Sequence, residues 1–492
     1  MTFTSIAFLV FFIAIVVGYY VCPHRFRWAL LLLGSSYFYM AFVPKYIFIL
    51  FFLIIVDFFF AKQFENMQGR GKRNLFIASL VVNVGVLFVF KYFNFFNENV
   101  SSLARALHWN YSIEALALIL PLGLSFHTFQ SISYLIEVYR GTYPAERHVG
   151  VYALYVMFFP QLIAGPIERP AHLIPQLTKA VSFEMGNLGS GLRLMAWGYF
   201  KKLVIADRLA VYVNAVYADV ASASGLGILL AMFAFALQLY GDFSGYTDIA
   251  RGSARVLGID LVHNFDQPYF SHSVTEFWRR WHMSLSSWFR DYVYLPLAWR
   301  GRERGVWWTY GAIITAFILV GVWHGAAWTY VVMGLLFGCY IVVEMITKPA
   351  RQAFSALVGL DRLPRVHHAL QIASTFIVVS MTWVFFRSPD LTTAFAFLRR
   401  LFTGWDVSLV QSATAYLTHP ATIFNFRNVD LVLMFCFVAV LFLVEYTKDA
   451  HEARPFFGTR SLFVQSFLYS SLLLAISMFG LFTTNAFIYF QF

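Results

Sequence analysis

The sequence predicts an all-α polytopic membrane protein, because apolar residues dominate the chain and recur in runs of helix length. Of its 492 residues, 60% are apolar and 12% are charged, and the mean hydropathy is +0.66. A soluble domain has far more charged and polar residues. Apolar runs of about 20 residues, the length that lets an α-helix cross a hydrocarbon layer of about 30 Å, recur from end to end. We therefore expect about 11 to 13 transmembrane or re-entrant helices in a single membrane domain, residues 1–492.

Short polar segments separate the expected spans, and the chain shows no internal repeat and no long linker. The first apolar run lacks a basic leader and a small-residue cleavage site, so we expect it to remain as a helix. In chain order, the expected spans are 3–22, 28–43, 46–61, 74–92, 115–138, 150–165, 190–215, 226–243, 306–322, 326–346, 370–386, 429–446 and 463–486.

The net charge of +11 comes from short basic clusters between the apolar runs. The clusters within 25–27, 70–73 and 140–147 follow alternate crossings, which is the pattern of cytoplasmic loops in a multi-pass protein. This placement favours a membrane protein in contact with lipids and argues against nucleic-acid binding. The three cysteines lie singly in apolar surroundings and give neither a disulfide framework nor a zinc-ligand spacing: Cys22, Cys339 and Cys436.

Residues 271–299 have the pattern of an amphipathic helix at the membrane interface. Ser273 is followed three residues later by Glu276, which matches a capping box at a helix start. An interfacial helix explains the arginines, which would contact lipid phosphates, but it does not explain His282. The apolar positions of the stripe recur at spacings of three and four: Trp278, Trp281, Leu285, Trp288 and Tyr292.

The apolar run 305–343 is about twice as long as one span needs, and His324 stands at its midpoint. Gly321 and Gly325 flank the midpoint and permit a break, so we expect the run to enter, break and return. Burial favours the neutral imidazole, and a neutral imidazole accepts a proton, as a general base must. The alternative is a core histidine that is hydrogen-bonded to a helix carbonyl.

These two segments resemble the signature of a known family. FWRRWHMSLSSWFRDYVYLPL and GVWHGAAWTYVVMGLLFG together are similar to the paired-histidine segments of the membrane-bound O-acyltransferases. PLGLSFHTFQSISYLIEVYRG, FFPQLIAGPIERP and QLYGDFSGYTDIARG agree with the same family, whose signature core here covers about 121–345. Within the family, the chain looks most like the bacterial branch that contains alginate O-acetylase and the peptidoglycan and cellulose O-acetylation membrane proteins. The teichoic-acid D-alanylation protein is a more distant relative.

The resemblance implies a catalytic role for His324, with His282 as a second catalytic or substrate-positioning residue, in a central funnel between the helices. It also implies acetyl-CoA as the acyl donor, with no permanently bound cofactor. No motif for a metal or for nucleotide hydrolysis is present in the sequence, so we expect no metal site. The residues expected to bind substrate are Trp278, Arg279, Arg280, Trp281, Arg290, Asp242, Asp248 and Trp323.

Asp242 and Asp248 interrupt an apolar span, where carboxylates are costly and need partners. Arg251 and Arg255 lie three and seven residues after Asp248, on the same face of a helix, so a structural ion pair is available. Lining of a tunnel for the acyl donor is the alternative.

Residues 487–492 resemble an F-x-Y-x-x-F motif that is carried by the partner peptide of teichoic-acid D-alanylation and by polysaccharide-acetylating relatives. In those proteins the tyrosine is implicated as an acyl carrier, which here would be Tyr489. A thiol and a phenol, with pKa values of about 8.5 and about 10, are comparable leaving groups, so acyl exchange between them is nearly balanced. The alternative is an aromatic anchor at the membrane interface.

The sequence therefore predicts an O-acetyltransferase that moves acetyl groups from cytoplasmic acetyl-CoA across the membrane, for O-acetylation of an extracytoplasmic polysaccharide such as alginate, cellulose or peptidoglycan. A periplasmic polysaccharide acetyltransferase is the expected partner. A D-alanyl or other acyltransferase of the same family is one alternative. A polysaccharide or lipid exporter is another, although an exporter would be expected to show repeated halves.

Overall fold

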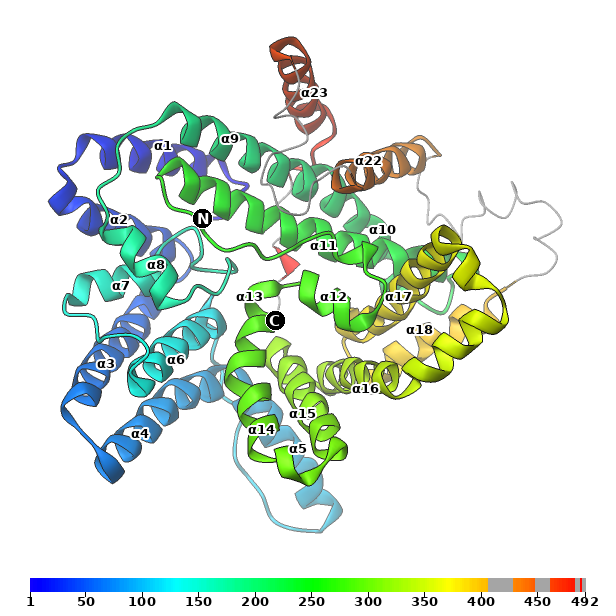
Figure 1. Ribbon diagram of the computed structural model, residues 1–492, viewed down its shortest axis with the longest axis horizontal. Coiled ribbons are helices and arrows are strands. Elements are labelled where there is room, and N and C mark those ends of the chain that lie inside the picture. Colours follow the sequence, from blue (N-terminus) through cyan, green and yellow to red (C-terminus); the bar gives the residue numbers. More distant parts are fainter. Residues whose placement is uncertain (406–427, 447–460, 483–486, 489–492) are drawn as a thin grey trace. The chain divides into compact units, whose positions relative to one another are not determined.

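The computed structural model describes residues 1–405, 428–446, 461–482 and 487–488, and none of these residues forms a strand. The chain divides into two compact units. Unit 1 comprises Met1–Met195 and Tyr246–Val262, and unit 2 comprises Ala196–Gly245 and His263–Phe492. Two of the three boundaries fall inside helices, α9 (Met185–Tyr199) and α11 (Gly225–Val256), which are labelled in Figure 1, and the third falls in the loop after α11.

Unit 1 is a set of helices joined by short turns, drawn from blue to cyan in Figure 1. Local capping explains several helix ends: Ser5 accepts a hydrogen bond from the N–H of Phe8, and Gly141, at φ 74°, closes α6. Its helices, besides parts of α9 and α11, are α1 (Ile6–Val21), α2 (His24–Met40), η1 (Pro44–Tyr46), α3 (Ile47–Asn66), α4 (Gly69–Leu87), η2 (Phe88–Tyr92), α5 (Phe93–Ala106), α6 (Leu124–Arg140), α7 (Val149–Met157) and α8 (Pro170–Thr178).

A buried carboxylate, Glu168, joins three parts of unit 1. It precedes α8 within the GPIERP sequence and is fully buried. One carboxylate oxygen accepts a hydrogen bond from the backbone N–H of Val262 at 2.6 Å, and the other lies 2.6 Å from Nδ1 of His172. Because both oxygens have partners, the carboxylate stabilises the contact between α8 and the segment that follows α11.

Replacing Glu168 with Ala should therefore destabilise the protein by about 1–3 kcal/mol, since the Val262 N–H loses its buried acceptor. The loss is measured as a lower thermal midpoint of the purified protein in detergent. Glu184→Ala, at an exposed position near the start of α9, is the matched control and should leave the midpoint unchanged. Equal midpoints for the two variants would contradict the structural role of Glu168.

Unit 2 contains the two histidine segments, which Figure 1 draws in green and yellow-green. Its long helices pack around a core rich in aromatic side chains. Besides parts of α9 and α11, its helices are η3 (Phe200–Ala206), α10 (Asp207–Ala218), η4 (Pro268–Phe270), α12 (Val274–Arg280), α13 (Met283–Phe289), η5 (Arg290–Tyr294), α14 (Leu295–Arg300), η6 (Arg302–Arg304), α15 (Val306–His324), α16 (Trp328–Leu357), η7 (Leu360–Arg362), α17 (Pro364–Arg387), α18 (Leu391–Thr403), α22 (Asn428–Tyr446) and α23 (Leu462–Phe479).

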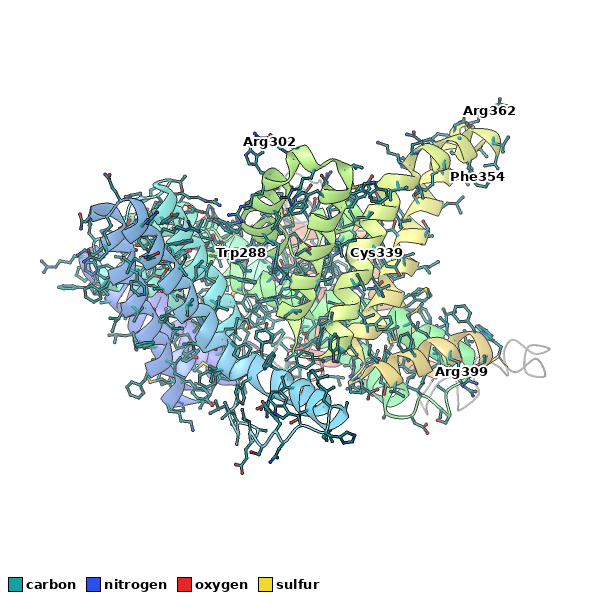
Figure 2. The ribbon with its side chains drawn as sticks, turned by 90° about the horizontal axis from the view of Figure 1, so that it is seen from below. Trp288, Arg302, Cys339, Phe354, Arg362 and Arg399 are labelled. Atoms are coloured by element: carbon teal, nitrogen blue, oxygen red, sulfur yellow. The ribbon has the colours of Figure 1, made fainter. Side chains whose placement is uncertain are left out.

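The run 305–343 enters, breaks and returns, which confirms the expected hairpin. α15 ends at His324, and α16 begins four residues later at Trp328 and packs along α15. The two backbones approach closely at glycines: a Cβ at Gly321 would collide with the carbonyl oxygen of Tyr330. Figure 2 shows Arg302 and Arg362 at the same end of this hairpin, so His324 lies at the opposite end of α15 from Arg302.

Gly321→Ala should separate α15 from α16 and destabilise the protein by about 1–3 kcal/mol, because the added methyl group meets backbone atoms that cannot turn away. Gly311→Ala, on the same helix, is the matched control, since no atom lies within 4 Å of its added Cβ. Thermal unfolding in detergent compares the two variants. The close-packed hairpin predicts a lower midpoint for the first variant only, and a stable Gly321→Ala would contradict it.

The expectation of one amphipathic helix over 271–299 is wrong. The segment is broken into α12, α13, η5 and α14, and the break falls at His282, whose backbone is left-handed at φ 43°. The capping box is present only in part, because Ser273 accepts from the N–H of Glu276 while Glu276 accepts from the N–H of His272. The tryptophans at 278, 281 and 288 are buried within unit 2, and the position of the segment at the membrane interface stays a prediction.

The all-α polytopic membrane fold is confirmed. Six helical segments in the described part of the chain are long and apolar enough to cross a membrane, fewer than the 11 to 13 crossings or re-entrant pieces expected. The expected span 115–138 is helical only from Leu124, because Gly123 is left-handed at φ 74°, and α7 (Val149–Met157) covers only residues 150–157 of the expected span 150–165. The six segments are Pro44–Asn66, Gly69–Ala106, Gly225–Val256, Val306–His324, Trp328–Leu357 and Pro364–Arg387.

Candidate active site

His324 is the last residue of α15 and is 4% exposed. Its ring lies 4.8 Å from the ring of Trp323 and 5.4 Å from that of Phe386 on α17, measured between centroids. The C-terminus of a helix carries a partial negative charge, which stabilises an imidazolium placed there. His324 thus lies in apolar surroundings, at the negative end of the dipole of α15.

His282 is fully buried and stands between α12 and α13. Left-handed backbone is uncommon for a residue other than glycine, and such conformations concentrate at functional sites. The conformation is held by Asn264, in the loop after α11. The carbonyl oxygen of Asn264 accepts from the N–H of Met283 at 2.9 Å, and its side-chain oxygen accepts from the N–H of Ser284 at 3.2 Å.

The same side-chain oxygen of Asn264 fixes the tautomer of His282. Only an oxygen accepts from the Ser284 N–H, so this contact defines which atom of the amide faces His282. Nδ1 of His282 lies 3.0 Å from this oxygen and must therefore carry the ring proton and donate it. Nε2 is then the basic nitrogen of the ring.

Unit 2 brings the two predicted histidines together. Both histidines lie close to Trp323, whose ring is 5.9 Å from that of His282 and 4.8 Å from that of His324. His282 lies outside the six candidate spans, and burial together with the neighbouring His324 lowers its pKa well below the usual value. Two buried imidazoles near one tryptophan offer a proton acceptor and a second polar group in apolar surroundings.

The predicted tryptophans pack in the core next to this site. Trp281 is fully buried against Phe265 and Trp383, with ring centroids 5.1 and 5.3 Å away. Trp278 is 5% exposed and its ring lies 5.0 Å from that of Phe337. These contacts place both tryptophans in the packing around His282, and their expected binding of substrate stays a prediction.

The three predicted arginines lie apart from the histidine pair's buried contacts. Arg279 and Arg290 are exposed, and Arg290 pairs with its neighbour Asp291 at 2.8 Å. Arg280 pairs with Glu276, one turn earlier on α12, at 2.7 Å. Their expected role in binding the anionic donor stays a prediction.

The two predicted carboxylates, Asp242 and Asp248, belong to different units. In unit 1, Asp248 lies 4.0 Å from Arg251, the pairing expected from their spacing, whereas Arg255 pairs with Asp260 at 2.8 Å. In unit 2, Asp242 pairs with Lys202 at 2.5 Å.

Sequence reasoning missed four residues: Lys202 and Asp207, which form a buried charged cluster with Asp242, and Asn264 and Ser284, which contact each other beside His282. The only signal for the first two was a pair of adjacent lysines, Lys201 and Lys202, within the apolar run 190–215. Among the described residues, no group of three or more His, Cys, Asp or Glu side chains is arranged to hold a metal ion. Tyr489 lies outside the described residues.

Comparisons with known proteins identify the family to which the chain is similar. The profile of the MBOAT, membrane-bound O-acyltransferase, family matches residues 148–387, which include both histidines. The chain is 34% identical to the probable alginate O-acetylase AlgI of Pseudomonas putida, over 92% of this chain and 89% of that protein. It is 32% identical to the peptidoglycan O-acetyltransferase of Helicobacter pylori, over 82% of this chain and 78% of that protein.

A shorter similarity extends to the teichoic acid D-alanyltransferase of Bacillus subtilis, which is 31% identical over 46% of this chain and 60% of that protein. The similarity to the two acetylating relatives covers most of both chains, and the described residues form a multi-pass, all-helical membrane fold with two buried histidines in contact with one tryptophan. This chain therefore belongs to the membrane-bound O-acyltransferase family and is a multi-pass membrane acyltransferase.

Proposed function

We propose that the protein is an O-acetyltransferase of the cell inner membrane, which moves acetyl groups from cytoplasmic acetyl-CoA toward an extracytoplasmic polysaccharide. The observation that carries the proposal is the buried histidine pair, His282 and His324, in a chain that matches acetylating relatives over most of its length. Alginate and peptidoglycan are the acceptors named for those relatives, and an anionic or neutral glycan of that class is the proposed final acceptor.

In the proposed reaction, His324 is the general base. An acceptor hydroxyl attacks the thioester carbonyl carbon of acetyl-CoA while its proton passes to the His324 imidazole. The C–O bond forms, the C–S bond breaks, and the CoA thiolate then takes the proton from the imidazolium. His282, with its tautomer fixed by Asn264, positions the substrate beside His324.

The first acceptor in this proposal is the phenol of Tyr489. Its acetyl ester remains activated, because a phenol is a good leaving group, so the acetyl group passes on to a hydroxyl of a periplasmic polysaccharide acetyltransferase. α15 has 19 residues and is therefore about 28 Å long, close to the thickness of the hydrocarbon layer. With the Arg302 end of the hairpin on the cytoplasmic side, His324 stands toward the opposite face, where an outward-facing acceptor is needed.

A purified preparation in detergent tests the proposal directly. With acetyl-CoA labelled in the acetyl group, the proposal predicts release of CoA and transfer of the label to Tyr489, detected by peptide mass spectrometry. Tyr489→Phe should lose the label at that position. A protein that exports polysaccharide without transferring acetyl groups would leave acetyl-CoA intact, and that result would overturn the proposal.

The identity of the acyl group separates acetyl transfer from D-alanyl transfer, the activity named for the relative that matches less than half of this chain. The mass added to Tyr489 in protein purified from its native cells reports the group. We expect the mass of an acetyl group. The mass of an alanyl group would assign the protein to the other activity.

A further inference from the structure

The segment that leads to residue 488 is attached to η3 and its neighbours at three points within unit 2. The backbone carbonyl of Phe479 accepts from Nε of Arg208 at 2.8 Å, and the N–H of Leu481 donates to the carbonyl of Leu203 at 3.0 Å. Farther along, the N–H of Ile488 donates to Oδ2 of Asp242 at 2.8 Å. η3 is a π-helix, a rare conformation that is frequent at functional sites.

The third attachment point is a buried, charged binding site, formed by Lys202, Asp207 and Asp242, which we call the segment-binding site. Nζ of Lys202 lies 2.8 Å from Oδ1 of Asp207 and 2.5 Å from Oδ1 of Asp242. All three side chains are at most 4% exposed. Two carboxylates around one ammonium group leave an excess of negative charge. The second oxygen of Asp242 accepts a hydrogen bond from the backbone N–H of Ile488.

The bound residues are buried as well. Phe487 is 2% exposed and its ring lies 4.4 Å from Nζ of Lys202, a cation–π contact, while Ile488 is 7% exposed. Lys202 therefore contacts the phenylalanine ring, and its partner Asp242 binds the next peptide N–H. Ionised groups are costly to bury. Two of them, Lys202 and Asp242, contact this one short segment, which points to a role for the segment.

α11 carries both a residue of the segment-binding site and a residue that packs on His282. Asp242 is followed by Phe243, whose ring lies 4.7 Å from that of His282. Asp242 and Phe243 belong to the same turn of α11, on which neighbouring side chains point in different directions. One turn of α11 thus binds the 487–488 segment through Asp242 and packs on His282 through Phe243.

We propose that Lys202, Asp207 and Asp242 hold the 487–488 segment on the turn of α11 that packs on His282 through Phe243, so that the residue that follows, Tyr489, is presented for acyl transfer. This inference rests on the proposed carrier role of Tyr489. The three residues are positioning residues: they hold the backbone of the acceptor and take no part in bond making. Their loss should lower turnover and leave the KM for acetyl-CoA unchanged.

A substitution at residue 488 can remove the backbone N–H of this residue and leave the sequence of η3, α10 and α11 unchanged. Ile488→Pro lacks this donor, whereas Ile488→Ala keeps it and is the matched control. In the labelled acetyl-CoA assay, we expect at least about a tenfold lower rate of Tyr489 acetylation for the proline variant than for the alanine variant. Equal rates would overturn the inference.

Two variants of Asp242 test the same hydrogen bond from the acceptor side. Asp242→Asn keeps an oxygen acceptor for the Ile488 N–H, and Lys202 keeps Asp207 as its counter-ion, so most Tyr489 acetylation should remain. Asp242→Leu removes the acceptor and should reduce acetylation as Ile488→Pro does. If both Asp242 variants acetylate Tyr489 at the wild-type rate, the inference fails.

A disulfide cross-link tests directly whether residue 488 lies next to residue 242, and it does not depend on enzymatic activity. In a chain whose three cysteines are replaced by Ser, oxidised Asp242→Cys/Ile488→Cys should form an internal cross-link, and Ala234→Cys/Ile488→Cys, also on α11, should not. No cross-link in the first pair would overturn the inference. If the cross-link forms but the wild-type protein never acetylates Tyr489, the carrier role in the proposed function has failed, and the positioning of an acyl carrier fails with it.

Discussion

His324→Ala should reduce acetyl transfer by about 10²- to 10⁴-fold, the usual contribution of a general base, while the protein remains folded. The imidazole occupies the end of α15, where alanine fits without steric conflict, so stability should change little. The effect is measured as CoA release by the purified variant and as the O-acetyl content of the polysaccharide from cells that carry it.

The matched control is His24→Ala, which removes an exposed histidine near the start of α2 in unit 1. It should transfer acetyl groups at the wild-type rate. A His324→Ala protein as active as this control would show that another group accepts the proton.

Asn264→Ala should lower turnover by about 10- to 100-fold, as loss of a group that orients a catalytic side chain typically does. The substitution removes the acceptor that holds the proton of His282 on Nδ1 and that binds Ser284. CoA release under saturating acetyl-CoA measures the loss. Asn66→Ala, exposed at the end of α3, is the control and should be fully active.

The variant Asn264→Asp tests whether Asn264 acts by orienting His282 or only by packing against it. The readout is the pH dependence of activity. A carboxylate keeps the acceptor for Nδ1–H but favours the imidazolium, so it raises the pKa of His282. Because the neutral ring is the active form, activity should fall at low pH and recover as the pH rises through the raised pKa, which moves the acid limb of the profile upward. An unchanged profile would contradict the assigned role of Asn264.

The sequence alone predicts the features that depend on local composition. The length of the apolar run around His324 and the glycines beside it predict the α15–α16 hairpin, which the fold confirms. The spacing of Asp248 and Arg251 predicts an ion pair that forms within one turn of α11. In each case, the interacting residues lie close together in the chain.

Features that depend on distant residues were not predictable in the same way. A helical pattern over 271–299 gives no sign that Asn264, 18 residues before His282, binds the backbone of that segment and breaks the helix. Likewise, the partner of Asp242 is Lys202, 40 residues earlier, and periodicity carries no information about that pairing. Both arrangements are determined by tertiary packing.

A single turnover with labelled acetyl-CoA, comparing the purified wild-type protein with His324→Ala, tests most directly the claim that His324 takes the proton of the acceptor hydroxyl. The account predicts rapid labelling of Tyr489 in the wild type and about 10²-fold or greater slowing in the variant, with unchanged binding of acetyl-CoA. Labelling of Tyr489 at equal rates in the two proteins would contradict it.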